Sequence, residues 1–241
     1  MWAAAAWGII AASSLLIGSA LTFWLKPGRR LIGLIMAFGA GTLISAIAYD
    51  LVEDAAASGR TLLLGLGLAS GAVTFFVGDW WVARAGGAHR KRSSGAQAQG
   101  DSLGIFVGTL LDGIPESFIL GSSLLTGNGV NAAFLAAVFI SNLPEAMGAT
   151  TGLSAAGWSK RRIIGIWLAV VEVSALAAAS GYALFSIMPL EGVLPQAFAG
   201  GALLTMLADT MMPEAFENGG RPAGLLSVLG FAVAFALSQL T

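Results

Sequence analysis

Eight long apolar stretches constrain this chain more than any other feature of its sequence. A helix needs about 20 predominantly apolar residues, at about 1.5 Å per residue, to cross the hydrocarbon core of a bilayer. Each stretch is about that long, and short breaks rich in glycine, proline or charge separate them. The predicted helices cover residues 2–25, 31–56, 61–85, 102–126, 130–155, 162–187, 193–216 and 222–240.

The composition excludes a soluble domain. Hydrophobic residues make up 56% of the 241 residues and charged residues only 10%, against about 25% charged in ordinary globular proteins. The absence of cysteine excludes disulfides and thiolate metal sites, and a single histidine, His89, excludes polyhistidine sites. We therefore predict one all-α domain over residues 1–241, a polytopic integral membrane protein with eight transmembrane helices.

The basic residues predict the orientation of this domain. If the N-terminus lies outside, eleven of the twelve lysines and arginines fall in inner loops and only Arg60 in an outer one. Such an excess indicates the cytosolic side of a membrane. Both termini then lie outside, and the polar stretch 86–101 forms a cytosolic loop. In that loop, which has the composition of a flexible polar linker, we expect His89, beside Arg90, to be solvated.

Two internal echoes suggest repeated architecture. Asp112-Gly-Ile-Pro-Glu116-Ser recurs on the next predicted helix as Ser141-Asn-Leu-Pro-Glu145-Ala. A weaker and more distant echo relates the stretch that begins at Gly41 to the one that begins at Gly201. Internal repeats with interrupted helices are typical of secondary transporters whose substrate sites lie near the middle of the membrane.

Nine of the thirteen acidic residues fall inside the predicted helices, and the other four lie in loops or at helix ends. A carboxylate near the bilayer centre costs about 2.5–3.5 kcal/mol to insert, so four central ones cost roughly 10 kcal/mol. We expect no basic residue to lie deep enough to pair with them. Protons, proton sharing between carboxylates, or a bound cation must then neutralise this charge.

The central acids and their neighbours form a candidate metal site. The helical rise per residue places the pair Asp112 and Glu116, the pair Ser141 and Glu145, and Glu172 at a similar depth in the membrane. Proline in each repeated motif also frees a backbone carbonyl one turn earlier. Carboxylate, amide and carbonyl oxygens suit divalent cations such as Mg²⁺, Mn²⁺, Fe²⁺ or Zn²⁺. The predicted ligands are Asp112, Glu116, Asn142, Glu145 and Glu172, with Ser141 as a secondary ligand.

Other acids suggest a path to and from this site. Asp50 and Glu53 end the second helix on the outer side, where they could attract cations, although a solvated helix end is an equal alternative. Asp209 and Glu214 lie near the inner end of the seventh helix. Asp79 stands beside Trp80 and is interpreted as an interfacial residue of the aromatic belt.

The repeated motifs and the layout resemble the ZIP (Zrt-/Irt-like) family of divalent metal transporters. That family has eight helices, both termini outside, and Pro-Glu motifs on its fourth and fifth helices, matched here by Pro115-Glu116 and Pro144-Glu145. Asp112 and Ser141 stand where the family has histidine, so the chain resembles a divergent member. The remaining donors suit one metal better than two, and the resemblance also implies a homodimer.

These observations predict a secondary transporter, not an enzyme, that moves Zn²⁺, Fe²⁺, Mn²⁺ or a similar ion across a plasma membrane, the inner membrane in a bacterium. The chain has no GxxxxGK[ST] motif for ATP, so the ion gradient, the membrane potential or protons must drive transport. We expect the metal and the lipid bilayer as partners, and neither a prosthetic group nor a nucleic acid. Two alternatives stay open: an intramembrane carboxylate- or metal-dependent hydrolase, and a proton-coupled carrier of another solute.

Overall fold

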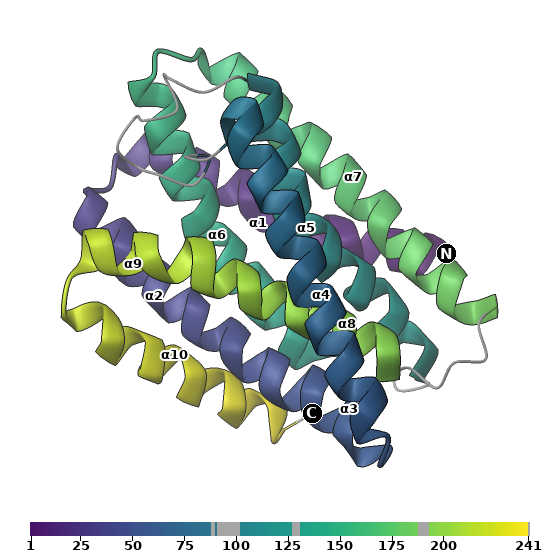
Figure 1. Cartoon of the computed structure of the whole chain (residues 1–241). Coiled ribbons are helices and arrows are strands. Elements are labelled where there is room, and N and C mark those ends of the chain that lie inside the picture. Colours follow the sequence, from purple (N-terminus) through teal and green to yellow (C-terminus); the bar gives the residue numbers. More distant parts are fainter. Residues whose placement is uncertain (88–89, 91–101, 127–130, 188–192, 241) are drawn as a thin grey trace.

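The computed structural model describes residues 1–87, 90, 102–126, 131–187 and 193–240, and the regular elements within these ranges are all helical (Figure 1). The α-helices are α1 (Trp2–Leu25), α2 (Arg29–Ala46), α3 (Asp54–Ala57), α4 (Thr61–Val82), α5 (Ser102–Ser123), α6 (Ala132–Ala155), α7 (Lys160–Ile187), α8 (Val193–Met206), α9 (Met212–Gly219) and α10 (Pro222–Ser238). Three π-helical segments, η1 (Ile47–Glu53), η2 (Ala83–Gly87) and η5 (Leu207–Met211), and the 3₁₀ turn η4 (Leu124–Thr126) continue them. The predicted ends lie close to these boundaries.

Five helical runs in the described residues are long and apolar enough to cross a membrane, judged by length and composition. They are Trp2–Leu25, Arg29–Ala57, Thr61–Gly87, Ala132–Ala155 and Lys160–Ile187. The helix α10 is apolar but shorter, and α5 is not among the five although it has 22 residues. The prediction of an all-helical protein is therefore confirmed for the described residues, and five helices have the length and composition to span a membrane, whereas the count of eight spans and the outward termini stay predictions.

Glycines bring α2 and α10 into backbone contact. A Cβ atom at Gly41 of α2 would lie 1.9 Å from the carbonyl oxygen of Ser227, and one at Gly230 of α10 would lie 2.0 Å from that of Phe38. Only glycine fits at both positions, because any side chain would overlap the facing helix. Such close approach of small residues is a common way to pack helices in membranes, where the hydrophobic effect supplies little drive.

The pair α4 and α8 repeats this arrangement. A Cβ atom at Gly71 of α4 would lie 1.8 Å from the carbonyl oxygen of Phe198, and one at Gly201 of α8 would lie 2.0 Å from that of Leu68. Gly41 and Gly201 are the first residues of the weaker echo, so each begins the repeated stretch at a helix contact of the same kind. The weaker echo therefore has a structural counterpart.

The same echo relates two π-helical segments. The helix α2 widens into η1 at Ile47, and α8 widens into η5 at Leu207, so each segment begins at the same distance from the first glycine of its stretch. Each segment carries an acidic residue, Asp50 in η1 and Asp209 in η5. Single π turns inside α-helices occur frequently at functional sites.

The core that holds the candidate site is formed around α2 and α6. Buried apolar side chains of these helices pack against those of α8 and η5, including Met36, Leu43, Phe134 and Leu203. The helix α5 packs mainly against α7, and α1 packs against both α6 and α7 (Figure 1). A hydrogen bond from the Trp167 indole to the Thr150 hydroxyl, 3.0 Å long, joins α7 to α6 within this interior.

Candidate functional site

Both repeated motifs lie in the interior of the protein. On α5, Asp112 and Glu116 retain 3% and 2% of their surface, and on α6 Glu145 retains 8%. Ser141 and Asn142 of the second motif are buried as well. All five therefore lie where a charged or polar group needs a partner, since burial without one costs several kcal/mol (about 2–7) for a neutral polar group.

Each motif has its proline inside the helix, where it removes one backbone hydrogen bond. Pro115 interrupts α5 and Pro144 interrupts α6. The carbonyl oxygen of Ile140, which Pro144 leaves without its helical donor, lies against α2 at Gly39, 3.3 Å from where a Cβ atom at that glycine would be. The absence of a side chain at Gly39 lets α2 approach the interrupted turn of α6.

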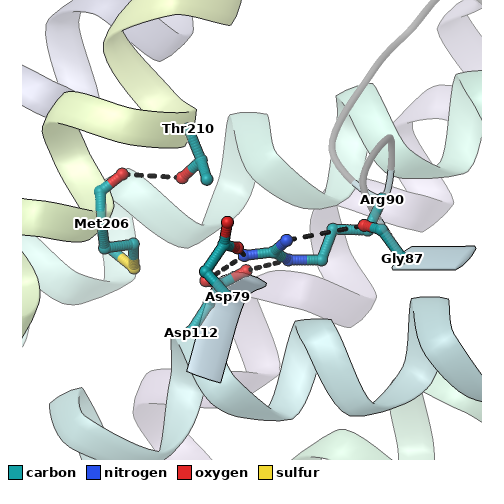
Figure 2. Close-up of polar contacts among 6 residues, drawn as sticks. All are labelled: Asp79, Gly87, Arg90, Asp112, Met206 and Thr210. Atoms are coloured by element: carbon teal, nitrogen blue, oxygen red, sulfur yellow. Dashed lines mark hydrogen bonds and ion pairs between the residues drawn. The ribbon is translucent and has the colours of Figure 1, made fainter. Parts of the chain in front are cut away.

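Arg90 enters the interior and binds Asp112 (Figure 2). Its Nε and Nη2 atoms donate to Oδ2 and Oδ1 of Asp112, each over 2.9 Å, in a two-pronged contact that only a guanidinium can make. Its Nη2 atom also lies 2.7 Å from Oδ1 of Asp79 on α4. A weaker hydrogen bond of 3.5 Å from Nη1 reaches the carbonyl oxygen of Gly87 at the end of η2.

One prediction is therefore wrong. The sequence predicts that no basic residue lies deep enough to pair with the central acids, whereas Arg90 is only 3% exposed and pairs with Asp112. Burial lowers the pKa of this guanidinium, but attraction to Asp112 and Asp79 and hydrogen bonds to both outweigh that effect and raise its pKa above the usual value. Arg90 consequently remains a fixed positive charge.

Asp79 is an ion-pair partner of Arg90, a role that its tryptophan neighbours in the sequence do not indicate. Its side chain is 24% exposed and forms an ion pair with Arg90, so it belongs to the polar interior of α4 and α5 as well as to the rim. The adjacent Arg84 instead stacks on the ring of Trp80, with its Cζ atom 3.5 Å from the ring centroid. The aromatic interpretation fits Arg84 better than Asp79.

Glu172 does not join the buried residues. It lies within α7, but it is exposed, and so are Leu168 and Leu176 one turn on either side. The buried face of α7 carries Trp167 and Val171 instead. The assignment of Glu172 to the buried site is therefore wrong, because position along a helix does not determine which face a residue occupies.

The four residues of the proposed path differ in burial. Asp50 of η1 is half-buried and Glu53 is exposed. Asp209 of η5 is exposed, and the next residue, Thr210, donates a 2.7 Å hydrogen bond to the carbonyl oxygen of Met206 (Figure 2). Glu214 of α9 is 5% exposed and accepts a hydrogen bond of 2.8 Å from the Asn218 side chain. Asp50 and Glu214 are thus the least exposed of the four path residues.

Within the described residues, no three histidine, aspartate or glutamate side chains converge closely enough to form a metal site. The predicted set is divided, since Asp112 binds Arg90 and Glu172 is exposed. Glu116, Asn142 and Glu145, with Ser141, remain as buried oxygen donors, on two helices that make few direct contacts with each other. His89 and most of the predicted loop 86–101 lie outside the described residues.

Arg90 is the main site residue that sequence reasoning missed, although one pattern pointed to it. Gly104, Gly108 and Asp112 follow each other at every fourth position and share one face of α5. A Cβ atom at Gly108 would lie 2.3 Å from Cδ of Arg90, and one at Gly104 would lie 2.2 Å from the carbonyl oxygen of Ala85. A groove lined by glycine that ends at a carboxylate is a slot for a basic side chain.

Comparison with known proteins adds no identification, because neither protein-family models nor curated protein sequences match this chain.

Proposed function

We propose that this protein is a secondary transporter that moves a divalent metal cation, Zn²⁺, Fe²⁺, Mn²⁺ or a similar ion, across a plasma membrane. In this proposal eight helices span the bilayer with both termini outside. The cation enters past Asp50, binds between α5 and α6, and leaves past Glu214. Net movement follows the ion gradient and the membrane potential, which supplies about 2.3 kcal/mol per elementary charge per 100 mV and about twice that for a divalent ion.

One observation carries this proposal: the interior holds more acid than base. The buried charged residues of the described chain are four acids and one base. The acids are Asp112, Glu116, Glu145 and Glu214, and the base is Arg90. If all ionise, three negative charges remain (four minus one), and a divalent cation is a natural way to neutralise most of them.

The ligands that we assign to the cation are Glu116, Glu145 and Asn142, with Ser141 nearby and Asp112 shared with Arg90. Two carboxylates and an amide are hard oxygen donors, and an interrupted helix beside each carboxylate can supply carbonyl oxygens. Glu172 is left out of this set because it is exposed. A homodimer is also part of the proposal, on the grounds of the family resemblance alone.

A second candidate is a proton-coupled carrier of an organic solute. The buried Arg90 favours it, because a fixed guanidinium between two carboxylates could bind an anionic group of a solute. The excess of buried acid favours the metal transporter over this alternative. Uptake measured with metals and with carboxylate solutes separates the two functions.

Purified protein in liposomes provides the test. We expect Mn²⁺ or Zn²⁺ uptake into vesicles held at an inside-negative potential, and a loss of at least about tenfold in Glu116→Gln and Glu145→Gln, which keep the size of the side chain but remove a charge. Glu217→Gln is the matched control, since Glu217 is an exposed acid of α9. Uptake at the unmodified rate in both buried variants contradicts the site, and uptake of a carboxylate solute without metal favours the alternative.

A further inference from the structure

Arg90 fills a slot that is shaped for it. Its side chain crosses α5 at Gly108, where even a methyl group would lie 2.3 Å from Cδ and 2.9 Å from Nε. The guanidinium then reaches Asp112 on α5 and Asp79 on α4 (Figure 2). Backbone shape, two acids and near-complete burial therefore fix a single position for this positive charge.

The contact with Asp112 occupies both of its carboxylate oxygens. Oδ1 accepts from Nη2 and Oδ2 accepts from Nε, each at 2.9 Å. A metal ion that binds either oxygen must lie within a few ångströms of the guanidinium, and like charges at that separation repel strongly in a poorly solvated interior. Arg90 and a cation therefore compete for this carboxylate.

Asp79 gives Arg90 an alternative partner. The Nη2 atom already lies 2.7 Å from Oδ1 of Asp79, which is more exposed than Asp112. If Asp112 turns toward a cation, Arg90 keeps one ion pair and is not left as an unpaired buried charge, a state that typically costs several kcal/mol, about 3–5. The two acids thus differ in role: Asp112 can exchange its partner, and Asp79 retains Arg90.

We infer that Arg90 is a resident counterion that competes with the transported divalent cation for Asp112 and so sets the affinity of the site. This inference rests on the proposed function. With Arg90 in place, the site is kept neutral enough to be stable when empty, and a bound ion is held loosely enough to leave. Without Arg90, Asp112 becomes a full ligand, so the cation binds more tightly and leaves more slowly.

Binding of Mn²⁺ to the purified full-length protein in detergent tests this inference, with the Mn²⁺-dependent rise in the thermal unfolding midpoint as the readout. In Arg90→Gln we expect half-saturation at an Mn²⁺ concentration lower by about tenfold or more, because one repulsive charge has been removed. In liposomes the same variant should show a lower KM and a lower maximal rate. Adding Asp112→Asn to Arg90→Gln should abolish the gain in affinity.

Arg84→Gln is the matched control, since it removes the same charge six residues earlier in the chain, in η2, but its guanidinium stacks on Trp80. We expect its Mn²⁺ affinity to be unchanged. An affinity in Arg90→Gln equal to or weaker than that of the unmodified protein overturns the inference while leaving the transporter intact. Absence of Mn²⁺ binding and of metal uptake in every variant, Arg90→Gln included, contradicts the proposed function instead.

Gly108→Ala provides a second test if Arg90→Gln does not fold. The added methyl group displaces Arg90 from its slot without altering any charge in the protein. The inference requires tighter Mn²⁺ binding in this variant too, and an unchanged affinity there overturns it.

Discussion

The two repeated motifs, on α5 and on α6, share their spacing but stabilise their first side chain differently. Asp112 of α5 receives two hydrogen bonds from Arg90, which precedes α5 in the chain. Ser141 of α6, at the equivalent place, donates a 3.0 Å hydrogen bond to the carbonyl oxygen of Val138 in its own helix. A buried hydroxyl can form its hydrogen bond within one helix, whereas a buried carboxylate needs a positively charged partner from another part of the protein.

Truncating the first side chain of each motif should separate the two motifs most clearly. Asp112→Ala removes two charge-assisted hydrogen bonds, each worth about 1.5–3 kcal/mol, so we expect it to lower the free energy of unfolding by about 3–6 kcal/mol even though Arg90 keeps its ion pair with Asp79. Ser141→Ala removes one local hydrogen bond and should cost about 0.5–1.5 kcal/mol. Titration with SDS in mixed micelles measures both. Equal losses in the two variants would show that Arg90 does not distinguish the motifs.

Giving the second motif a carboxylate is the next test. Ser141→Asp makes the first residue of both motifs acidic, but no arginine slot like that of Gly108 faces Ser141 in the described structure; its neighbour there is Gly39 of α2. We expect the free energy of unfolding to fall by about 2.5–3.5 kcal/mol in metal-free buffer. Added Mn²⁺ should restore part of that stability. A variant as stable as the original protein at neutral pH without metal would contradict this expectation.

The smallest effect concerns the two arginines that flank the end of η2. Arg84 is exposed and stacks on Trp80, whereas Arg90 is buried between two acids. Arg84→Gln should therefore cost only about 0.5–1 kcal/mol, the value of an exposed cation–π contact. The same SDS titration measures it, and a loss of several kcal/mol would mean that Arg84 has further contacts of structural importance.

The ends of the helices can be predicted because the signals are local. Apolar runs, glycines, prolines and charged breaks all act over short stretches of chain, and the predicted boundaries lie close to those of the structure. The π-helical segments are not predictable in this way, since a widened turn depends on the packing of neighbouring helices. Only the weaker echo, which begins at Gly41 and Gly201, hinted that Ile47 and Leu207 begin equivalent segments.

The candidate site can be predicted in part. Residue number gives the position of an acid along a helix, and Asp112, Glu116 and Glu145 are indeed buried. Position along the axis does not give the face of the helix, which is why the sequence assigns Glu172 to the site although it is exposed. The exposed Leu168 and Leu176 show that Glu172 belongs to an outward stripe that recurs at every fourth position.

Arg90 is missed for a different reason. Its neighbours in sequence are basic and polar, and nothing local separates it from Lys91 or Arg92. The relevant information lies on another helix, in the glycines that make room for its side chain. Partners that come from a loop and act on a distant helix are the part of such a site that local sequence patterns describe least well.

The link between Arg90 and Asp112 also bears on the order in which the chain is made. Synthesis proceeds from the N-terminus, so Arg90 has already left the ribosome when the helix that carries Asp112 emerges. That helix, α5, carries two buried acids, Asp112 and Glu116. Arg90 is therefore available to pair with Asp112 as soon as α5 is made, and under the proposed function this pairing would lower the cost of inserting α5 into the membrane.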